Sequence, residues 1–294
     1  MGDFKFIKNP ISGKWTIFAP KRAERPDAAK TVSPLCPFCI GREKEEPSAF
    51  RVGGKDPEDN WQIRVILNKF PFAPFHEIII HSPDHHKNFE ELPLDQVVLI
   101  FDTYRQRYNT YRNEGRVYIF HNRGERGGES LPHPHTQLTV IPNDVELDIP
   151  ARNSKDEDPT VSDRIETEYF LIYCPLSSQW PDEIWISSKK SQVFGDASDS
   201  EIQDLSFIIQ RIIQILDLRH GHEFPFNFYI YPGNNWYLRI MPRAKILGGF
   251  EIGTGIFVNT QDPKETMEFL IEHFETPNVE KIKTKHRAAY RKAV

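Results

Sequence analysis

The chain has 294 residues, of which 38% are hydrophobic and 12% aromatic, enough for a packed core in one large or two ordinary domains. Its formal net charge is −5, so general binding to nucleic acid through phosphate neutralisation is not expected. The first residues lack a signal-peptide pattern, and no stretch approaches the roughly 20 apolar residues of a membrane span. The sequence therefore predicts a soluble, cytoplasmic protein with neither a membrane nor a nucleic-acid partner.

A short strand at residues 15–20 precedes a loop with a cysteine pair. Three cysteines are too few for a disulfide framework, but Cys36 and Cys39 form a Cys-Pro-Phe-Cys motif. Prolines and Gly41 surround the motif, so a loop that binds zinc is favoured over the helix start of a redox motif. Tetrahedral zinc needs two further ligands, and the candidates are His81, His85, His86, His133 and His135. A metal-free loop with solvated histidines is the alternative.

Hydrophobic patterning predicts two groups of elements that follow the same order. After a charged loop at 44–60, the first group has strands at 64–67 and 77–81, a helix at 93–112, and strands at 117–121 and 138–141. A polar linker at 150–163 follows, and then strands at 169–173 and 183–187, a helix at 199–218, and strands at 227–231 and 236–241. The repeated order predicts an α+β fold with antiparallel strands that arose by internal duplication.

The densest group of polar residues is the stretch GGESLPHPHTQL at residues 127–138. In an extended segment residues i and i+2 face the same side, so His133 and His135 are predicted to lie close together. A neutral imidazole is a good nucleophile toward phosphorus, and nearby glycines let backbone N–H groups approach an anion. Ser130 and Gln137 can donate to phosphate oxygens, which favours phosphoryl-type transfer. Spacing alone also allows a polar turn with two surface histidines.

The stretch NRGERGGESLPHPHTQ at residues 122–137 resembles the active-site signature of galactose-1-phosphate uridylyltransferases, a transferase branch of the histidine-triad superfamily. Four other segments match this family in order: WTIFAPKRAERP at 15–26, CPFC at 36–39, VILNKFP at 65–71 and SPDHH at 82–86. The resemblance implies two tandem histidine-triad-like units, each an antiparallel sheet with packed helices. Residues 1–155 would form the unit with the zinc knuckle and the catalytic histidines, and residues 156–294 a degenerate second unit.

The resemblance implies a role for each matched residue. One structural zinc ion per subunit would be held by Cys36, Cys39, His85 and His133. The nucleophile would be His135, and phosphate oxygens would be bound by Ser130, Gln137, Asn122 and the backbone of Gly127 and Gly128. Asn68 would contact the nucleoside, Arg22 and Arg25 would lie near the nucleotide, and Glu251 would contact the hexose.

The reaction that the resemblance implies is ping-pong transfer between a nucleotide sugar and a hexose 1-phosphate. His135 attacks UDP-glucose and expels glucose 1-phosphate, and galactose 1-phosphate then takes the uridylyl group. Hydrolases of the superfamily carry a third histidine where Gln137 stands, so by analogy this glutamine favours transfer over hydrolysis. The resemblance also implies a homodimer.

Three departures from the family pattern define the alternatives. Family members carry a second metal site on a His-x-His pair, but Tyr237 and Arg239 occupy the matching positions here, so we expect that site to be absent. The segment GFEIGTG at 249–255 resembles that of ADP-glucose phosphorylases, and Thr136 stands where many uridylyltransferases have glycine. The alternatives are an adenylyl-transferring phosphorylase that uses the same histidine, and a nucleotide-binding protein without turnover.

Overall fold

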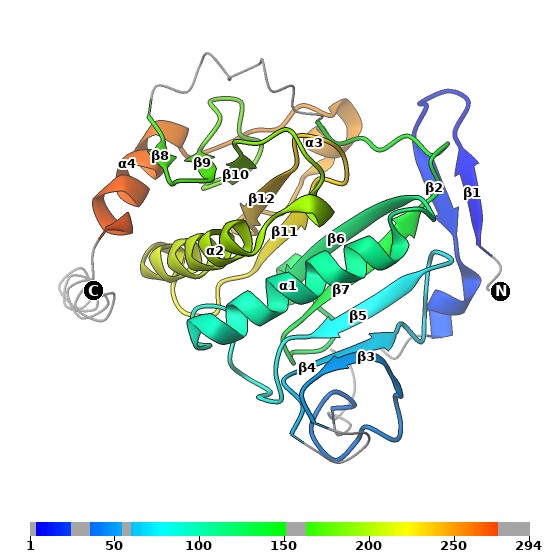
Figure 1. Cartoon of the computed structure of the whole chain (residues 1–294). Coiled ribbons are helices and arrows are strands. Elements are labelled where there is room, and N and C mark those ends of the chain that lie inside the picture. Colours follow the sequence, from blue (N-terminus) through cyan, green and yellow to red (C-terminus); the bar gives the residue numbers. More distant parts are fainter. Residues whose placement is uncertain (1–3, 25–35, 55–59, 151–162, 276–294) are drawn as a thin grey trace, which may run out of the picture.

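The computed structural model describes residues 4–24, 36–54, 60–150 and 163–275 (Figure 1). Its centre is a sheet of ten antiparallel strands, and the two long helices α1 (Leu94–Tyr111) and α2 (Asp199–His220) pack against one face of it. The α+β class predicted from the sequence is confirmed. Within these ranges, no helix has both the length and the apolar character needed to cross a bilayer.

The N-terminal half contributes five neighbouring strands. In sheet order they are β3 (Ser48–Val52), β4 (Ile63–Leu67), β5 (His76–Ile80), β7 (His135–Ile141) and β6 (Arg116–Arg123). The edge strand β3 lies inside the segment 44–60, where the charged composition predicted a loop. Phe50 packs against the core and against the guanidinium of Arg107, which explains why this polar segment forms a strand.

The C-terminal half repeats this arrangement on the other side of β6. Its strands follow in the order β11 (Phe226–Ile230), β12 (Tyr237–Pro242), β10 (Ile184–Ser188), β9 (Phe170–Tyr173) and β8 (Ile165–Glu166). Helix α2 begins with a capping box between Ser198 and Glu201, and its chain leaves at Gly221. The predicted boundary between residues 155 and 156 lies outside the described residues.

Strand register relates the two halves by a pseudo-two-fold axis. β6 and β11 pair antiparallel, with Phe120 opposite Tyr229. Phe120 is in turn opposite Gln137 of β7, and Tyr229 is opposite Arg239 of β12. If Phe120 and Tyr229 are equivalent, so are the last residues of the two helices, Tyr111 of α1 and His220 of α2. With this correspondence Gln137 matches Arg239, and Tyr237 takes the place of His135. The repeated element order seen in the sequence corresponds to this axis.

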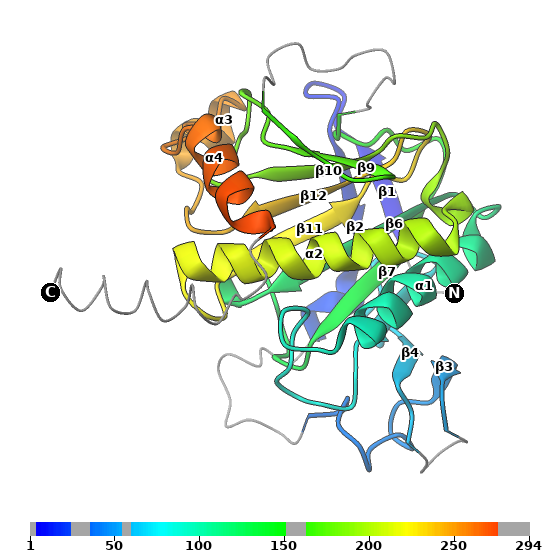
Figure 2. The ribbon, with the colours of Figure 1, turned by 60° about the vertical axis from the view of Figure 1, so that its left-hand side comes forward.

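The remaining elements lie around the sheet and were not predicted, apart from part of the N-terminal hairpin (Figures 1 and 2). A separate hairpin is formed by β1 (Lys5–Lys8) and β2 (Trp15–Phe18). Two helices, α3 (Gly249–Thr254) and α4 (Pro263–Phe274), follow β12. The described residues also contain three 3-10 turns: η1 (Pro20–Glu24), η2 (Glu125–Gly127) and η3 (Phe194–Asp196).

A buried polar network lies beneath the first residues of β7, on the face that α1 covers. The hydroxyl oxygen of Thr136 is 2.6 Å from the Tyr104 hydroxyl, 2.9 Å from Nε2 of His81 and 3.1 Å from Nδ1 of His121. Nδ1 of His121 is also 3.0 Å from the carbonyl oxygen of His135, so this nitrogen carries the proton of a neutral ring. Burial lowers the pKa of His81 and His121 well below the ordinary value.

Acid should destabilise the fold through His121. Because its pKa is lower in the folded chain than the unfolded value near 6.5, the unfolded chain binds more protons below that pH. The free energy of unfolding should therefore fall, by up to about 1.4 kcal/mol per pH unit for this residue, as the pH drops from about 6.5. Urea unfolding at a series of pH values measures this slope.

The matched variants are His121→Gln, which can still donate to the His135 carbonyl but does not titrate, and His86→Gln on the surface. We expect a shallower slope for His121→Gln alone. Equal slopes in the wild type and His121→Gln would contradict this role.

Candidate active site

Four side chains of metal-ligand type converge just before β7. Cys36 and Cys39 come from the loop before β3, His85 from the segment after β5, and His133 from the residue pair that leads into β7. Their donor atoms all lie within 4.8 Å of one another. Nδ1 of His133 is 3.8 Å and 3.6 Å from the two cysteine sulfurs, and Nδ1 of His85 is 3.2 Å from Cys39 Sγ. The chain thus has a Cys2His2 cluster capable of holding a metal ion.

The geometry of this cluster fits a tetrahedral zinc ion. In such a site a sulfur and a nitrogen ligand are separated by roughly 3.6 Å, given usual bond lengths to zinc. Nε2 of His133 lies 2.9 Å from the Ser82 carbonyl oxygen, to which it donates, so Nδ1 presents its lone pair to the sulfurs. Burial raises the pKa of the Cys36 thiol to about 11, so a thiolate here needs a neighbouring cation.

His135 is the first residue of β7 and packs directly against the cysteine loop. Its Nδ1 lies 2.8 Å from the carbonyl oxygen of His133, which accepts the proton and leaves the lone pair on Nε2. The ring of Phe38, between the two cysteines, lies 5.4 Å from the ring of His135 and 6.1 Å from that of His133. His135 is 4% exposed. His133 and His135 thus lie close together: the ring of Phe38 packs against both, and His135 donates to the backbone carbonyl of His133.

Gln137 is held by a histidine that the sequence did not single out. Nε2 of His76 lies 3.0 Å from Oε1 of Gln137 and 3.1 Å from the side-chain amide of Asn68. The backbone N–H of Phe72 donates to Nδ1 of His76 at 3.4 Å, so Nε2 of the neutral ring carries the proton and donates to Gln137. Nδ2 of Asn68 is itself a donor and therefore makes no hydrogen bond to this nitrogen. The amide NH2 of Gln137 is then directed away from His76 and can donate to an anion. The available signal was strand register, because Ile78 is opposite Gln137 and His76 lies diagonally on the same face.

In the glycine loop between β6 and β7, backbone N–H groups donate to carbonyl oxygens of the same loop. Those of Gly127 and Gly128 donate to the carbonyls of Gly124 and Glu125, each at 2.9 Å. Gly124 has φ +73°, and an added Cβ would lie 2.9 Å from Pro225, so only glycine fits there. The structure therefore places Gly127 against β11 and engages the N–H groups of Gly127 and Gly128 within the turn.

Asn122 and the glycine loop are supported from the C-terminal half. The side-chain amide of Asn227 in β11 donates to Oδ1 of Asn122 at 2.8 Å and to the carbonyl of Gly127 at 2.7 Å. Asn227 is a second residue that the sequence did not indicate. It faces the same side of the sheet as Asn122 because these two residues are opposite each other in the β6–β11 pair.

The other residues with implied roles lie further out. Arg22 donates to the Phe70 carbonyl at 3.0 Å and covers the ring of Phe72, which in turn packs against His76. Ser130 is half-buried in the loop before His133. Glu251 lies in α3, where its carboxylate accepts from Lys245 at 2.5 Å and from the Gly248 N–H at 3.1 Å. Arg25 lies outside the described residues.

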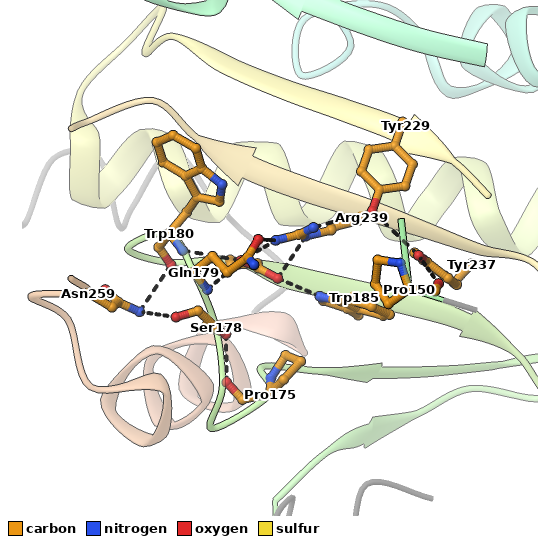
Figure 3. A network of polar contacts seen from close by, with 11 residues as sticks. Pro150, Pro175, Ser178, Gln179, Trp180, Trp185, Tyr229, Tyr237, Arg239 and Asn259 are labelled. Atoms are coloured by element: carbon orange, nitrogen blue, oxygen red, sulfur yellow. Dashed lines mark hydrogen bonds and ion pairs between the residues drawn. The ribbon is translucent and has the colours of Figure 1, made fainter. Parts of the chain in front are cut away.

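In the C-terminal half an ion pair stands where the N-terminal half has Gln137 (Figure 3). Arg239 donates from Nε and Nη2 to the two oxygens of buried Glu183, both at 2.8 Å, and to Gln179 at 2.9 Å. The hydroxyl of Tyr237 donates to the Pro150 carbonyl at 2.6 Å. This half therefore has neither an imidazole nucleophile nor a His-x-His pair at these positions.

Comparisons with known proteins agree with this geometry. Residues 75–140 match the family described as galactose-1-phosphate uridyl transferase, N-terminal domain. An ADP-glucose phosphorylase of Arabidopsis thaliana is 28% identical, over 90% of this chain and 92% of its own. A galactose-1-phosphate uridylyltransferase of Thermotoga maritima is 25% identical, over 90% of this chain and 96% of its own.

Among solved structures, an ADP-glucose phosphorylase from Arabidopsis thaliana with bound ADP-glucose superposes with a TM-score of 0.70. It is 26% identical, and the match covers 92% of this chain and 98% of that one. These matches confirm the family that the motifs indicated. The chain is thus similar over most of its length to galactose-1-phosphate uridylyltransferases and to ADP-glucose phosphorylases.

Proposed function

We propose that the chain is a nucleotidylyltransferase that moves a uridylyl group from UDP-glucose to a hexose 1-phosphate. The hexose 1-phosphate that we propose is galactose 1-phosphate. The observation that carries this proposal is the tautomer of His135. Its Nδ1 proton is held by the His133 carbonyl, so Nε2 is the nitrogen that carries the lone pair when this buried ring is neutral. Gln137, two residues along the same face of β7, is held by His76 with its amide NH2 available to phosphate oxygens.

The two half-reactions then need little proton transfer. Nε2 of His135 forms a bond to the α-phosphorus while the bond to the leaving oxygen breaks, and glucose 1-phosphate departs as an anion. The Nδ1–H bond to the His133 carbonyl stabilises the positive charge that the ring acquires. A phosphate oxygen of galactose 1-phosphate next attacks the same phosphorus, the N–P bond breaks, and UDP-galactose is released with neutral His135 restored.

The finer expectations belong to the same proposal. One zinc ion would be held by Cys36, Cys39, His85 and His133. It would stabilise the cysteine loop, whose Phe38 packs against His135. Ser130, Asn122 and Asn68 would bind the nucleotide, together with Arg22, Arg25, Gly127 and Gly128, and Glu251 would contact the hexose. We further propose a cytoplasmic homodimer whose chain divides at residue 155 into two histidine-triad-like units, and no second metal ion at Tyr237 and Arg239.

A second candidate donor is ADP-glucose. The relative from Arabidopsis thaliana named ADP-glucose phosphorylase is similar over 90% of this chain, which supports it. In that version His135 becomes adenylylated as glucose 1-phosphate leaves, and inorganic phosphate attacks the adenylyl group to give ADP. The nucleophile and the leaving group are the same, so the two versions differ only in the base and in the acceptor.

Intact-protein mass spectrometry after incubation with each donor tests the proposal. UDP-glucose should add one UMP residue to the chain, and ADP-glucose should add one AMP residue if the second version holds. His135→Ala should give no adduct, whereas His86→Ala, which changes an exposed histidine nearby, should react like the wild type. An adduct on His135→Ala, or none on the wild type with either donor, would refute covalent catalysis by His135.

The orientation of Gln137 by His76 gives a separate expectation. His76→Phe removes the hydrogen bond to Oε1, worth about 1 kcal/mol, so adduct formation should slow roughly five- to ten-fold. Gln137→Ala removes the donor itself and should slow the reaction by about 10²–10³-fold. Quenched-flow measurement of adduct formation gives both rates. An unchanged rate in His76→Phe would show that Gln137 is oriented by other contacts.

The zinc assignment predicts a coupled loss of metal and stability. Cys36→Ser should reduce the zinc content below one ion per chain and lower the melting temperature, because binding energy of a structural ion is folding energy. Cys174→Ser changes the buried cysteine of the C-terminal half and serves as the control for metal content. Elemental analysis and thermal unfolding provide the readouts. Equal zinc in the wild type and Cys36→Ser would remove Cys36 from the ligand set.

A further inference from the structure

A second group of metal-ligand side chains lies between the two halves of the chain. Glu90 belongs to the segment before α1, Asp217 to the last turn of α2, and His222 follows that helix. One donor atom of each lies within 4.8 Å of the others. Among the described residues, none of the three takes part in the Cys2His2 cluster or makes a hydrogen bond or ion pair with Asn122, His135 or Gln137.

The two carboxylates of this group are buried and incompletely bonded. The side chains of Glu90 and Asp217 are 0% and 2% exposed. Glu90 Oε1 accepts from Arg123 Nη2 at 2.7 Å, and Asp217 Oδ2 lies 3.3 Å from Nδ1 of His222. In the described part of the chain, Oε2 of Glu90 and Oδ1 of Asp217 have no hydrogen-bond partner. Leaving a buried carboxylate oxygen without a hydrogen bond costs free energy. We therefore expect a cation or a hydrogen-bond donor beside these two oxygens.

The surrounding charges favour a cation. Besides Glu90 and Asp217, Glu91 approaches this group, 3.7 Å from Nε2 of His222. In the described part of the chain, Arg123 pairs with Glu90 and also lowers the pKa of Asp217. Burial and then the charge of Glu90 raise the pKa of Asp217 to about 6, as expected for two carboxylates that face each other without a cation between them. His222 is 51% exposed, which gives solvent and ions access.

We propose that Glu90, Asp217 and His222 bind a divalent cation, with water completing its coordination. Two carboxylates and one imidazole, without a thiolate, suit Mn²⁺ or a similar first-row ion. Arg123 would stay on the second oxygen of Glu90 and orient that ligand from outside the coordination shell. Because Glu90 precedes α1 and Asp217 lies in the last turn of α2, the ion would link the N-terminal and C-terminal halves on the helical side of the sheet.

Two arrangements without a metal would satisfy the same oxygens. One is a proton shared by the two carboxylates. The other is a buried water that also accepts from Nη1 of Arg123, which has no partner in the described residues. Direct measurement of metal binding separates both from the proposal, and it does not depend on the nucleotidyl-transfer activity.

The test is a Mn²⁺ titration of the zinc-loaded protein, followed by the electron paramagnetic resonance signal of free Mn²⁺. Zinc should stay on the thiolates, because Mn²⁺ is the weaker competitor for them. We expect one Mn²⁺ to bind per wild-type chain and the binding to weaken at least ten-fold in Asp217→Asn and Glu90→Gln. Glu91→Gln removes the same charge from the same surface but keeps all three ligands, so it should bind Mn²⁺ within a few-fold of the wild type.

No Mn²⁺ uptake by the wild type would overturn the site in favour of a shared proton or a water. Uptake that is equal in the wild type and in the ligand variants would do the same. If circular dichroism shows that Asp217→Asn or Glu90→Gln does not fold, His222→Ala decides, because half of its side chain is exposed. Mn²⁺ should raise the melting temperature of the wild type and of Glu91→Gln, but not that of His222→Ala.

Discussion

The hydrogen bond from Nδ1 of His135 to the carbonyl oxygen of His133 is the contact on which the rest of the site depends. The same residue, His133, turns its ring toward the two cysteines and donates from Nε2 to Ser82. The two histidines of this short segment thus orient each other: His133 belongs to the Cys2His2 cluster, and its carbonyl oxygen sets which ring nitrogen of His135 carries the lone pair. Phe38 completes the coupling, because its ring packs against both histidines. The cysteine loop is therefore in direct contact with His135 through Phe38.

The second constraint is the continuity of the sheet across the two halves. Pairing of β6 with β11 places Asn227 of the C-terminal half under the glycine loop of the N-terminal half. The same register puts Arg239 at the position equivalent to Gln137. There the guanidinium of Arg239 donates its hydrogen bonds to Glu183 and Gln179. The second half therefore has the same fold as the first and packs against it, but it lacks the residues of the proposed reaction.

The sequence allowed the repeated element order, the α+β class and the family to be predicted, because periodicity and short motifs are local properties. Contacts between residues on different strands could not be predicted from the sequence. His76 and Asn227 act through register, which no local pattern reports, and β3 is stabilised by the packing of Phe50 rather than by its own composition. The N–H groups of Gly127 and Gly128 differ from expectation because a 3-10 turn engages them. Motif letters identify a loop but not its hydrogen bonds.

The register of β6 and β11 has a consequence for how such a chain could arise and be divided. Phe120 is opposite its own equivalent, Tyr229, which is the geometry of a symmetric dimer whose subunits share a sheet. An isolated N-terminal half would expose residues 119–123 of β6, which pair with β11 here, as an unpaired edge. Two such fragments could join edge to edge across a true two-fold axis, and the covalent link removes that freedom. Fusion thereby frees one of two identical sites to change its residues while the other keeps them.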